Sequence, residues 1–169
     1  AHADAQLFRG AVWLFTPMAQ GEACADKQAL QKAGAWREWI TRFGSRMLDL
    51  DPQRHDEVCA WASHLPQMVG TALAALLEDT FPEVENSDDK NLDSSAGQLR
   101  AIGGRAMHEM TRLGASPFSM WRDIAQTNEE AIADALLALE QRLALIRENL
   151  KQPELRDQFQ RANRFRSRF

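Results

Sequence analysis

The sequence predicts a mainly α-helical chain in which the last β-α-β piece of an α/β sheet precedes a longer helical domain. Three observations support this fold class. A short apolar run at 12–15 is followed by a helical pattern and a second short strand, the order of a parallel crossover unit. Asp51-Pro52 then begins a helix, and nearly every later segment has helical spacing. In the range 132–150, leucine and isoleucine recur at coiled-coil-like intervals.

The first predicted domain, residues 1–50, is the end of an α/β sheet. Residues 12–15 give the signal of a short buried strand, and 46–51 give that of a second strand. Between them, 25–43 carries apolar side chains at helical spacing and is followed by a glycine that stops the helix. Because strands need neighbours to pair with, we expect this piece to belong to a larger sheet that lies mostly outside the chain.

The second predicted domain, residues 51–169, is helical. Its first helix begins at Asp51 and runs to about residue 78. The segment 82–101 is rich in Asp, Asn, Ser and Glu and is expected to be a loop. Ser116 is the expected N-cap of the next helix, with a proline at its first position.

The long helix at 132–150 carries the apolar seam. Two interpretations remain open: the seam packs inside its own subunit, or it forms an interface between subunits. Gln152-Pro153 is expected to break this helix before a final short one. Four arginines among the last nine residues are typical of a solvated helix end, with a phosphate site as the alternative.

Composition excludes several classes of function. The chain has 169 residues and a net charge of −4, so no general attraction to nucleic acid or membrane is expected. No apolar run reaches the ~18 residues of a membrane span, and AHADAQLFRG lacks the basic-then-apolar pattern of a secretion signal, so none is expected. Cys24 and Cys59 are far apart and are expected to be reduced in a cytoplasmic protein. His55 and His64 are not at metal-binding spacing, so no metal is expected.

A stripe of small and polar residues runs along the first long helix, opposite an apolar stripe. It comprises Asp56, Ala60, Ser63, Gln67, Gly70 and Ala74, with His64 at its edge. A solvated face usually carries Lys, Glu and Arg instead. Pro66 also removes a helical N–H and is expected to bend the helix. This face is therefore expected to be approached closely, either by another helix or by a ligand.

A second group of residues surrounds Arg112. This arginine lies in a predicted turn next to Thr111, is followed by small residues, and precedes Trp121. Such an arginine suits bidentate binding of a carboxylate. Pairing with an acidic neighbour such as Glu109 is the structural alternative.

Together these two groups resemble the prephenate dehydrogenase family of tyrosine biosynthesis. The stretch HDEVCAWASHLPQ matches the family pattern H-D-x6-S-H-L-P, and MTRLGASPFSMWRDI matches D-M-T-R-x3-S-x3-M-W-R-D-I. The opening DAQLFRGAVWLFTP is similar to the stretch after the family's nucleotide-binding strands. The resemblance covers nearly the whole chain. It implies the end of a Rossmann-type domain followed by a helical substrate-binding and dimerisation domain.

The resemblance also implies a function, the NAD- or NADP-linked oxidative decarboxylation of prephenate to 4-hydroxyphenylpyruvate by a homodimer. Arg112 would hold a substrate carboxylate, Ser63 and His64 would line the pocket, and Gln67 would reach the other polar end of the substrate. Trp121 would be an apolar wall, which the partner subunit could lend. Three further residues would support these from outside the pocket: His55, Asp56 and Thr111.

The chain departs from the family pattern at two places. GRAMHE, residues 104–109, replaces the usual Gly-Gly-Gly-Phe-Arg-Asp. No G-x-G-x-x-G fingerprint follows a strand, and His2 does not match the catalytic His-Pro-Met-x-Gly motif. We therefore expect the chain to be the C-terminal part of such an enzyme. The catalytic histidine and the main cofactor site would lie upstream, and the chain alone would be inactive.

Two alternatives to a prephenate dehydrogenase remain open. An arogenate dehydrogenase would act on the corresponding amino acid. A non-catalytic helical dimerisation module would bind tyrosine as a regulator, and tyrosine is also a candidate feedback ligand of the enzyme. The side-chain contacts that distinguish prephenate from arogenate, and NAD from NADP, do not follow from these motifs.

Overall fold

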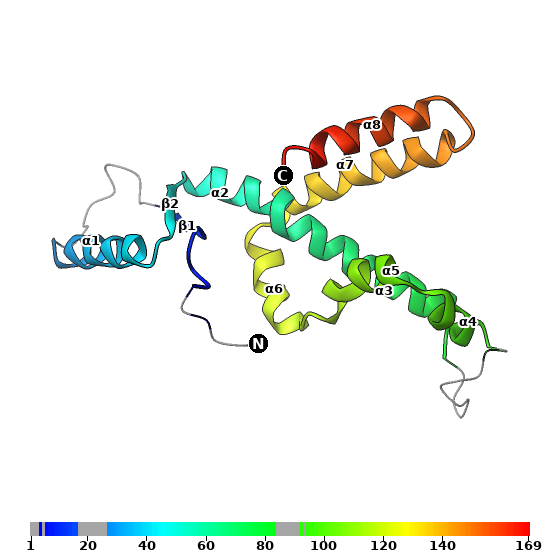
Figure 1. Cartoon of the computed structure of the whole chain (residues 1–169), viewed down its shortest axis with the longest axis horizontal. Helices are drawn as coiled ribbons and strands as arrows, with labels where there is room; N and C mark the ends of the chain where they lie inside the picture. Colours follow the sequence, from blue (N-terminus) through cyan, green and yellow to red (C-terminus); the bar gives the residue numbers. More distant parts are fainter. Residues whose placement is uncertain (1–3, 5, 17–26, 84–91, 93) are drawn as a thin grey trace. The chain divides into compact units, whose positions relative to one another are not determined.

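A computed structural model describes residues 4, 6–16, 27–83, 92 and 94–169 (Figure 1). The chain forms two compact units, residues 1–58 and 59–169. The predicted division at residue 50 lies close to this boundary and stays a prediction. Helices dominate, and the described strands form one two-stranded parallel sheet. This arrangement confirms the predicted fold class. Cys24 lies outside the described residues.

The first unit contains the predicted strand–helix–strand piece. Strand β1 (Val12–Phe15) pairs in parallel with β2 (Arg46–Asp49), and Val12 lies opposite Arg46. Helix α1 (Lys27–Arg42) lies between them in sequence, and its Arg37 forms hydrogen bonds with both carboxylate oxygens of Asp49 on β2. These hydrogen bonds lower the pKa of Asp49 from its ordinary value.

The prediction that β1 is a buried strand is wrong for this chain. Its side chains alternate, and Val12 and Leu14 are 48% and 43% exposed. Trp13 on the other face packs edge-on against Trp36 of α1 with 5.7 Å between ring centroids. Because successive side chains of a strand point to opposite faces, α1 covers only one of them.

The second unit begins within the long helix predicted from Asp51. Helix α2 (Pro52–Cys59) is followed directly by a π-helical turn, η1 (Ala60–His64), and then by α3 (Leu65–Thr80). The Leu65 N–H donates to the carbonyl of Ala60, five residues back, which is the hydrogen bond of a π-helix. The helix therefore accommodates Pro66 by a wider turn immediately before it, instead of ending there.

The prediction of a loop over 82–101 is wrong in its last part. Helix α4 (Ser95–Ile102) occupies it, because the Ser94 hydroxyl accepts a hydrogen bond from the Gly97 N–H at 3.0 Å and caps the helix. Residues 84–91 and 93 lie outside the described residues. Helix α5 (Arg105–Thr111) follows, and then a 3-10 turn, η2 (Arg112–Ala115). The predicted turn at Arg112 is confirmed.

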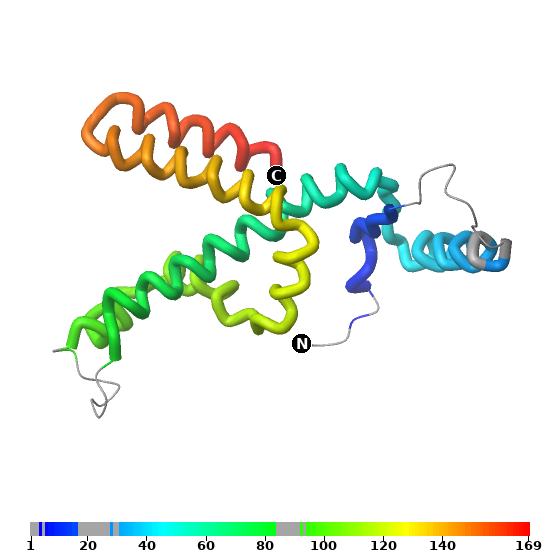
Figure 2. Tube along the Cα trace, turned by 180° about the vertical axis from the view of Figure 1, so that it is seen from behind, coloured from blue at the N-terminus to red at the C-terminus, as the bar shows by residue number. Residues whose placement is uncertain are grey.

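The last three helices follow the predicted order with one correction. Helix α6 (Phe118–Thr127) has Pro117, not Ser116, as its N-cap, and no side chain caps it. Helices α7 (Glu129–Glu148) and α8 (Glu154–Arg166) lie side by side in Figures 1 and 2, and Arg142 donates to Gln158 at 2.8 Å between them. The predicted break before a final helix is present, but α7 already ends at Glu148, and Pro153 is the N-cap of α8.

The apolar seam of α7 divides into a packed part and an exposed part. Ile132 and Ala135 are buried, and this end of α7 packs against η1 and α3. Leu143 and Leu150 are 56% and 61% exposed. The first interpretation, packing within the subunit, therefore accounts for the beginning of the seam but leaves its end uncovered. No helix in the described parts of the chain is long and apolar enough to cross a membrane.

Candidate functional site

Gln67 joins the two motifs that the sequence singled out. Its side chain is only 4% exposed, and its Nε2 donates to the Leu113 carbonyl at 2.7 Å and to Thr71 Oγ1 at 3.2 Å. Its Oε1 accepts a hydrogen bond from Ser116 Oγ at 3.2 Å. The amide therefore ties α3 to the η2 turn and to the residue that precedes α6. The Ser116 hydroxyl thus contacts Gln67 and makes no capping hydrogen bond to α6.

Two glycines allow η2 to approach α3 closely. A Cβ atom on Gly70 would lie 2.9 Å from Leu113 Cβ, and one on Gly114 would lie 2.8 Å from Ala74 Cβ. Neither distance is compatible with an ordinary side chain. The C-terminal part of the small-residue stripe thus packs against another segment of the same chain. Ser63, nearer its start, is exposed.

His64 lies in a second cluster, formed by η1, α6 and the junction before α7. Its ring meets the Trp121 ring edge-on, with 5.8 Å between centroids and 84° between planes. Its Nδ1 is 3.1 Å from Nδ2 of Asn128, which is only 9% exposed. The Trp121 indole nitrogen is enclosed and has no hydrogen-bond partner among the described residues. The structure thus brings two predicted site residues, His64 and Trp121, into contact.

Asn128 is a residue that the sequence analysis missed. The only signal for it is its place, directly between two helical patterns, where asparagine usually caps a helix. Its contact with His64 joins positions 64 residues apart, which no local pattern reveals.

Arg112 extends from the η2 turn as an exposed cation. Within the described part of the chain it forms no ion pair, so the pairing with Glu109 that the sequence left open does not form. The hydroxyl of its neighbour Thr111 donates to the Met107 carbonyl one turn back on α5, at 2.8 Å. The guanidinium is therefore held on a turn whose backbone is fixed by Gln67, and it remains available for an anion.

His55 and Asp56 interact with each other on α2, with 2.9 Å between Nδ1 and Oδ1. They lie in the first unit, and their supporting role stays a prediction.

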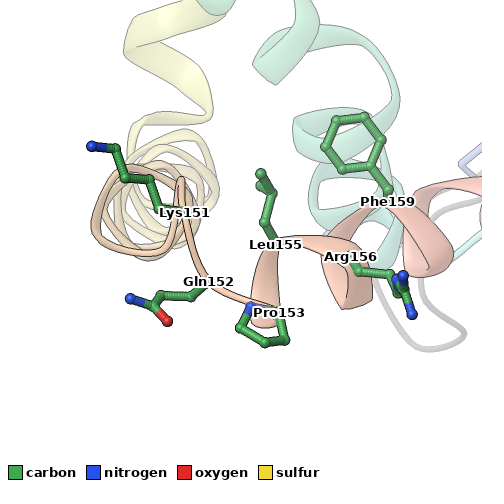
Figure 3. Close-up of a pocket in the computed structure, with 6 residues that line it drawn as sticks. All are labelled: Lys151, Gln152, Pro153, Leu155, Arg156 and Phe159. Atoms are coloured by element: carbon green, nitrogen blue, oxygen red, sulfur yellow. The ribbon is translucent and has the colours of Figure 1, made fainter.

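Two of the hollows in the second unit lie beside α3 and at the turn between α7 and α8. One of about 300 Å³ lies between α3 and the α5–η2 segment, is mostly apolar, and is lined in part by Pro66, Gly70 and Leu113. A larger hollow of about 560 Å³ opens at the turn between α7 and α8 (Figure 3). Figure 3 shows Leu155 and Phe159 projecting to one side of it. None of the predicted site residues lines the larger hollow, so its size does not make it the site.

The described residues of this chain do not form a dinucleotide cradle. The paired glycines Gly103 and Gly104 lie between α4 and α5, not after a strand. The space that a Gly103 side chain would take is occupied by the end of the Met107 side chain. Among the same residues, no group of three or more His, Cys, Asp or Glu side chains is placed to hold a metal ion.

Comparisons with known proteins agree with this architecture. A prephenate dehydrogenase from Bacillus subtilis (strain 168) is 29% identical over 128 residues, which are 76% of this chain and 29% of that protein. The crystal structure of Aquifex aeolicus prephenate dehydrogenase in complex with hydroxyphenyl propionate and NAD+ has a TM-score of 0.71 at 24% identity, covering 96% of this chain and 51% of that chain.

Synechocystis arogenate dehydrogenase has a TM-score of 0.69 at 23% identity, covering 96% of this chain and 54% of that one. These likenesses to solved structures show the fold, and this chain spans about half the length of those proteins.

The family model that describes the prephenate dehydrogenase dimerization domain matches residues 51–162. The match covers most of the chain, begins at the helix that Asp51 caps, and includes both motifs joined by Gln67. This chain therefore belongs to the prephenate dehydrogenase family and contains its dimerization domain.

Proposed function

We propose that the full-length protein containing this chain oxidatively decarboxylates prephenate to 4-hydroxyphenylpyruvate, with NAD+ or NADP+ as hydride acceptor, in tyrosine biosynthesis. The family match and the Bacillus subtilis relative support this proposal. The observation that carries it is the hydrogen bond from Gln67 to the Leu113 carbonyl. That bond fixes the turn bearing Arg112 against the helix bearing Ser63 and His64.

In this proposal the chain binds and orients the substrate. Arg112 forms a bidentate ion pair with one substrate carboxylate, because it is exposed on a fixed turn and lacks an acidic partner among the described residues. Ser63 and His64 line the pocket, with Trp121 behind the His64 ring. Gln67 remains a proposed contact to the polar end of the substrate. Its amide already makes three hydrogen bonds within the chain, which leaves one lone pair of Oε1 for a ligand.

The cofactor is proposed to bind mainly outside this chain, since no G-x-G-x-x-G fingerprint follows a strand in this sequence. It would accept the hydride from the substrate. The catalytic histidine is likewise proposed to lie in a part of the protein outside these residues.

An assay of the full-length protein with prephenate and with arogenate tests the proposal. We expect reduction of NAD+ or NADP+ that depends on prephenate. Preference for arogenate would establish the second candidate, which the fold shared with the Synechocystis enzyme also permits. Reduction with neither substrate would contradict both. Adding tyrosine to the same assay tests the proposed feedback ligand.

The 169-residue chain alone is expected not to turn over prephenate, because the proposed base and cofactor site lie outside it. The purified chain should give no steady production of NADH or NADPH above a blank without protein. Sustained turnover would show that the chain contains a complete active site.

We also propose that the protein is a homodimer through the dimerization domain. Leu143 on α7 and Leu150 in the turn after it are exposed, and α8 exposes Phe159 and Phe165, so apolar surface is available for a second copy. Obligate interfaces of this kind bury more than ~2,000 Å². Light scattering at micromolar concentration should give about twice the mass of one chain. A monomer under these conditions would contradict this prediction.

A further inference from the structure

Asn128 lies at the N-cap position of α7, but its side chain makes no capping hydrogen bond to that helix. It lies between α6 and α7, and its backbone N–H donates to the Ile124 carbonyl at 3.1 Å. Its own carbonyl accepts from the Ile132 N–H at 3.1 Å, so the backbone belongs to both helices. Asparagine is favoured at an N-cap because its side-chain oxygen accepts a helical N–H. No such hydrogen bond forms here.

The Asn128 side chain instead contacts His64. The two side chains approach to 3.1 Å between Nδ2 and Nδ1, and Asn128 is 9% exposed. Burial of an amide is costly unless it is hydrogen-bonded, so the contact has a definite geometry. Trp121 packs edge-on against the same ring. The imidazole is thus restrained by two residues from the α6–α7 region.

The chemistry of this contact specifies the state of the ring. With the Asn128 NH₂ group facing the ring, as in this structure, the amide donates, and Nδ1 accepts and carries no proton. A neutral imidazole with an unprotonated Nδ1 carries its proton on Nε2, and Nε2–H is then a donor. Prephenate offers only oxygen atoms to such a donor. An amide also orients the ring without adding a charge, unlike a carboxylate in the same place.

We propose that Asn128 is a positioning residue, whose amide holds the His64 ring in the tautomer that presents Nε2–H to a substrate oxygen. The inference rests on the proposed function for the identity of that substrate. Asn128 itself does not touch the substrate and acts through His64.

The ring nitrogens of His64 report the contact directly. In the ¹⁵N-labelled chain at neutral pH, we expect Nδ1 unprotonated and Nε2 protonated, with signals identified by their loss in His64→Gln. In Asn128→Asp a carboxylate replaces the amide in nearly the same shape and can only accept. Nδ1 should therefore become protonated. A protonated Nδ1 in the unsubstituted chain, or unchanged ring signals in Asn128→Asp, would overturn the proposal.

Steady-state kinetics of the full-length protein test whether the Asn128–His64 contact affects substrate binding. Asn128→Ala removes the amide, and we expect KM for prephenate to rise about tenfold, equivalent to the loss of one buried hydrogen bond. Asn149→Ala is the matched control, because Asn149 also ends a helix but donates to the Leu145 carbonyl and not to a histidine. It should leave KM unchanged. A folded Asn128→Ala protein with the KM of the unsubstituted enzyme would overturn the positioning role. If the protein oxidises neither prephenate nor arogenate, the proposed function fails, and the ring-nitrogen experiment still decides the Asn128–His64 contact.

Discussion

Replacing Arg112 by alanine in the full-length protein is expected to raise the KM for prephenate about thirtyfold or more. The loss of a charge-assisted ion pair in a partly dry pocket costs on the order of 2–4 kcal/mol, and each ~1.4 kcal/mol is a factor of ten. Arg112→Lys should recover little, because an ammonium lacks the planar fork that binds a carboxylate bidentately. Affinity for the dinucleotide should hardly change. Steady-state kinetics with each substrate varied in turn measures both effects.

Arg105 supplies the matched control for this experiment. It is exposed on α5, on the neighbouring segment of the same unit, and it also forms no ion pair within the described part of the chain. If Arg112 acts through one specific pair, Arg105→Ala should leave KM within about twofold of its original value, as expected for an exposed charge. Equal effects of the two substitutions would mean that only the general positive charge matters. An unchanged KM in Arg112→Ala would remove Arg112 from the site.

Replacing Gln67 by leucine is expected to destabilise the second unit by about 2–3 kcal/mol. The substitution removes three hydrogen bonds from a side chain that is 4% exposed, and the half-buried Ser116 hydroxyl loses its partner on Gln67. The Leu113 carbonyl keeps one partner, the Ser116 N–H, which limits the cost. For a chain of this size the melting temperature should fall by roughly 5–10 °C.

Gln126, an exposed residue of α6, supplies the control for the stability measurement. Gln126→Leu should change the free energy of unfolding by no more than about 0.5 kcal/mol. Thermal unfolding followed by circular dichroism compares the two variants. If Gln67→Leu melts like the unsubstituted protein while its KM for prephenate rises, Gln67 serves the ligand and not the packing of η2 on α3.

Local sequence patterns were sufficient to predict the order of elements. The apolar run at 12–15 and the Gly44 stop predicted β1 and α1, and Asp51-Pro52 predicted the long helix. Each of these signals acts over a few residues. The prediction failed for α4. The polar composition of 82–101 indicated a loop, whereas the Ser94 cap begins a helix there. Burial of β1 also could not be predicted, because it depends on what covers the second face of the sheet.

The candidate site was predictable in its residue types but not in its contacts. The stripe near Pro66 and the turn at Arg112 were found because small residues, proline and arginine carry distinctive chemistry. The contact of Gln67 with Leu113 spans 46 residues, and that of His64 with Asn128 spans 64. Ser116 has a strong local preference for capping, but in the structure its hydroxyl contacts Gln67 and α6 begins one residue later than predicted. Long-range hydrogen bonds of this kind leave no periodic trace in the sequence.

A crystal structure of the full-length protein with hydroxyphenyl propionate bound would test most directly whether residues of α3 and η2 line the substrate pocket. The same compound is present in the Aquifex aeolicus complex. We predict that its carboxylate accepts hydrogen bonds from the Arg112 guanidinium, at about 2.7–3.2 Å, and that its ring lies beside His64. A compound bound elsewhere, with Arg112 in solvent and the His64–Asn128 contact facing no ligand, would contradict the proposed site.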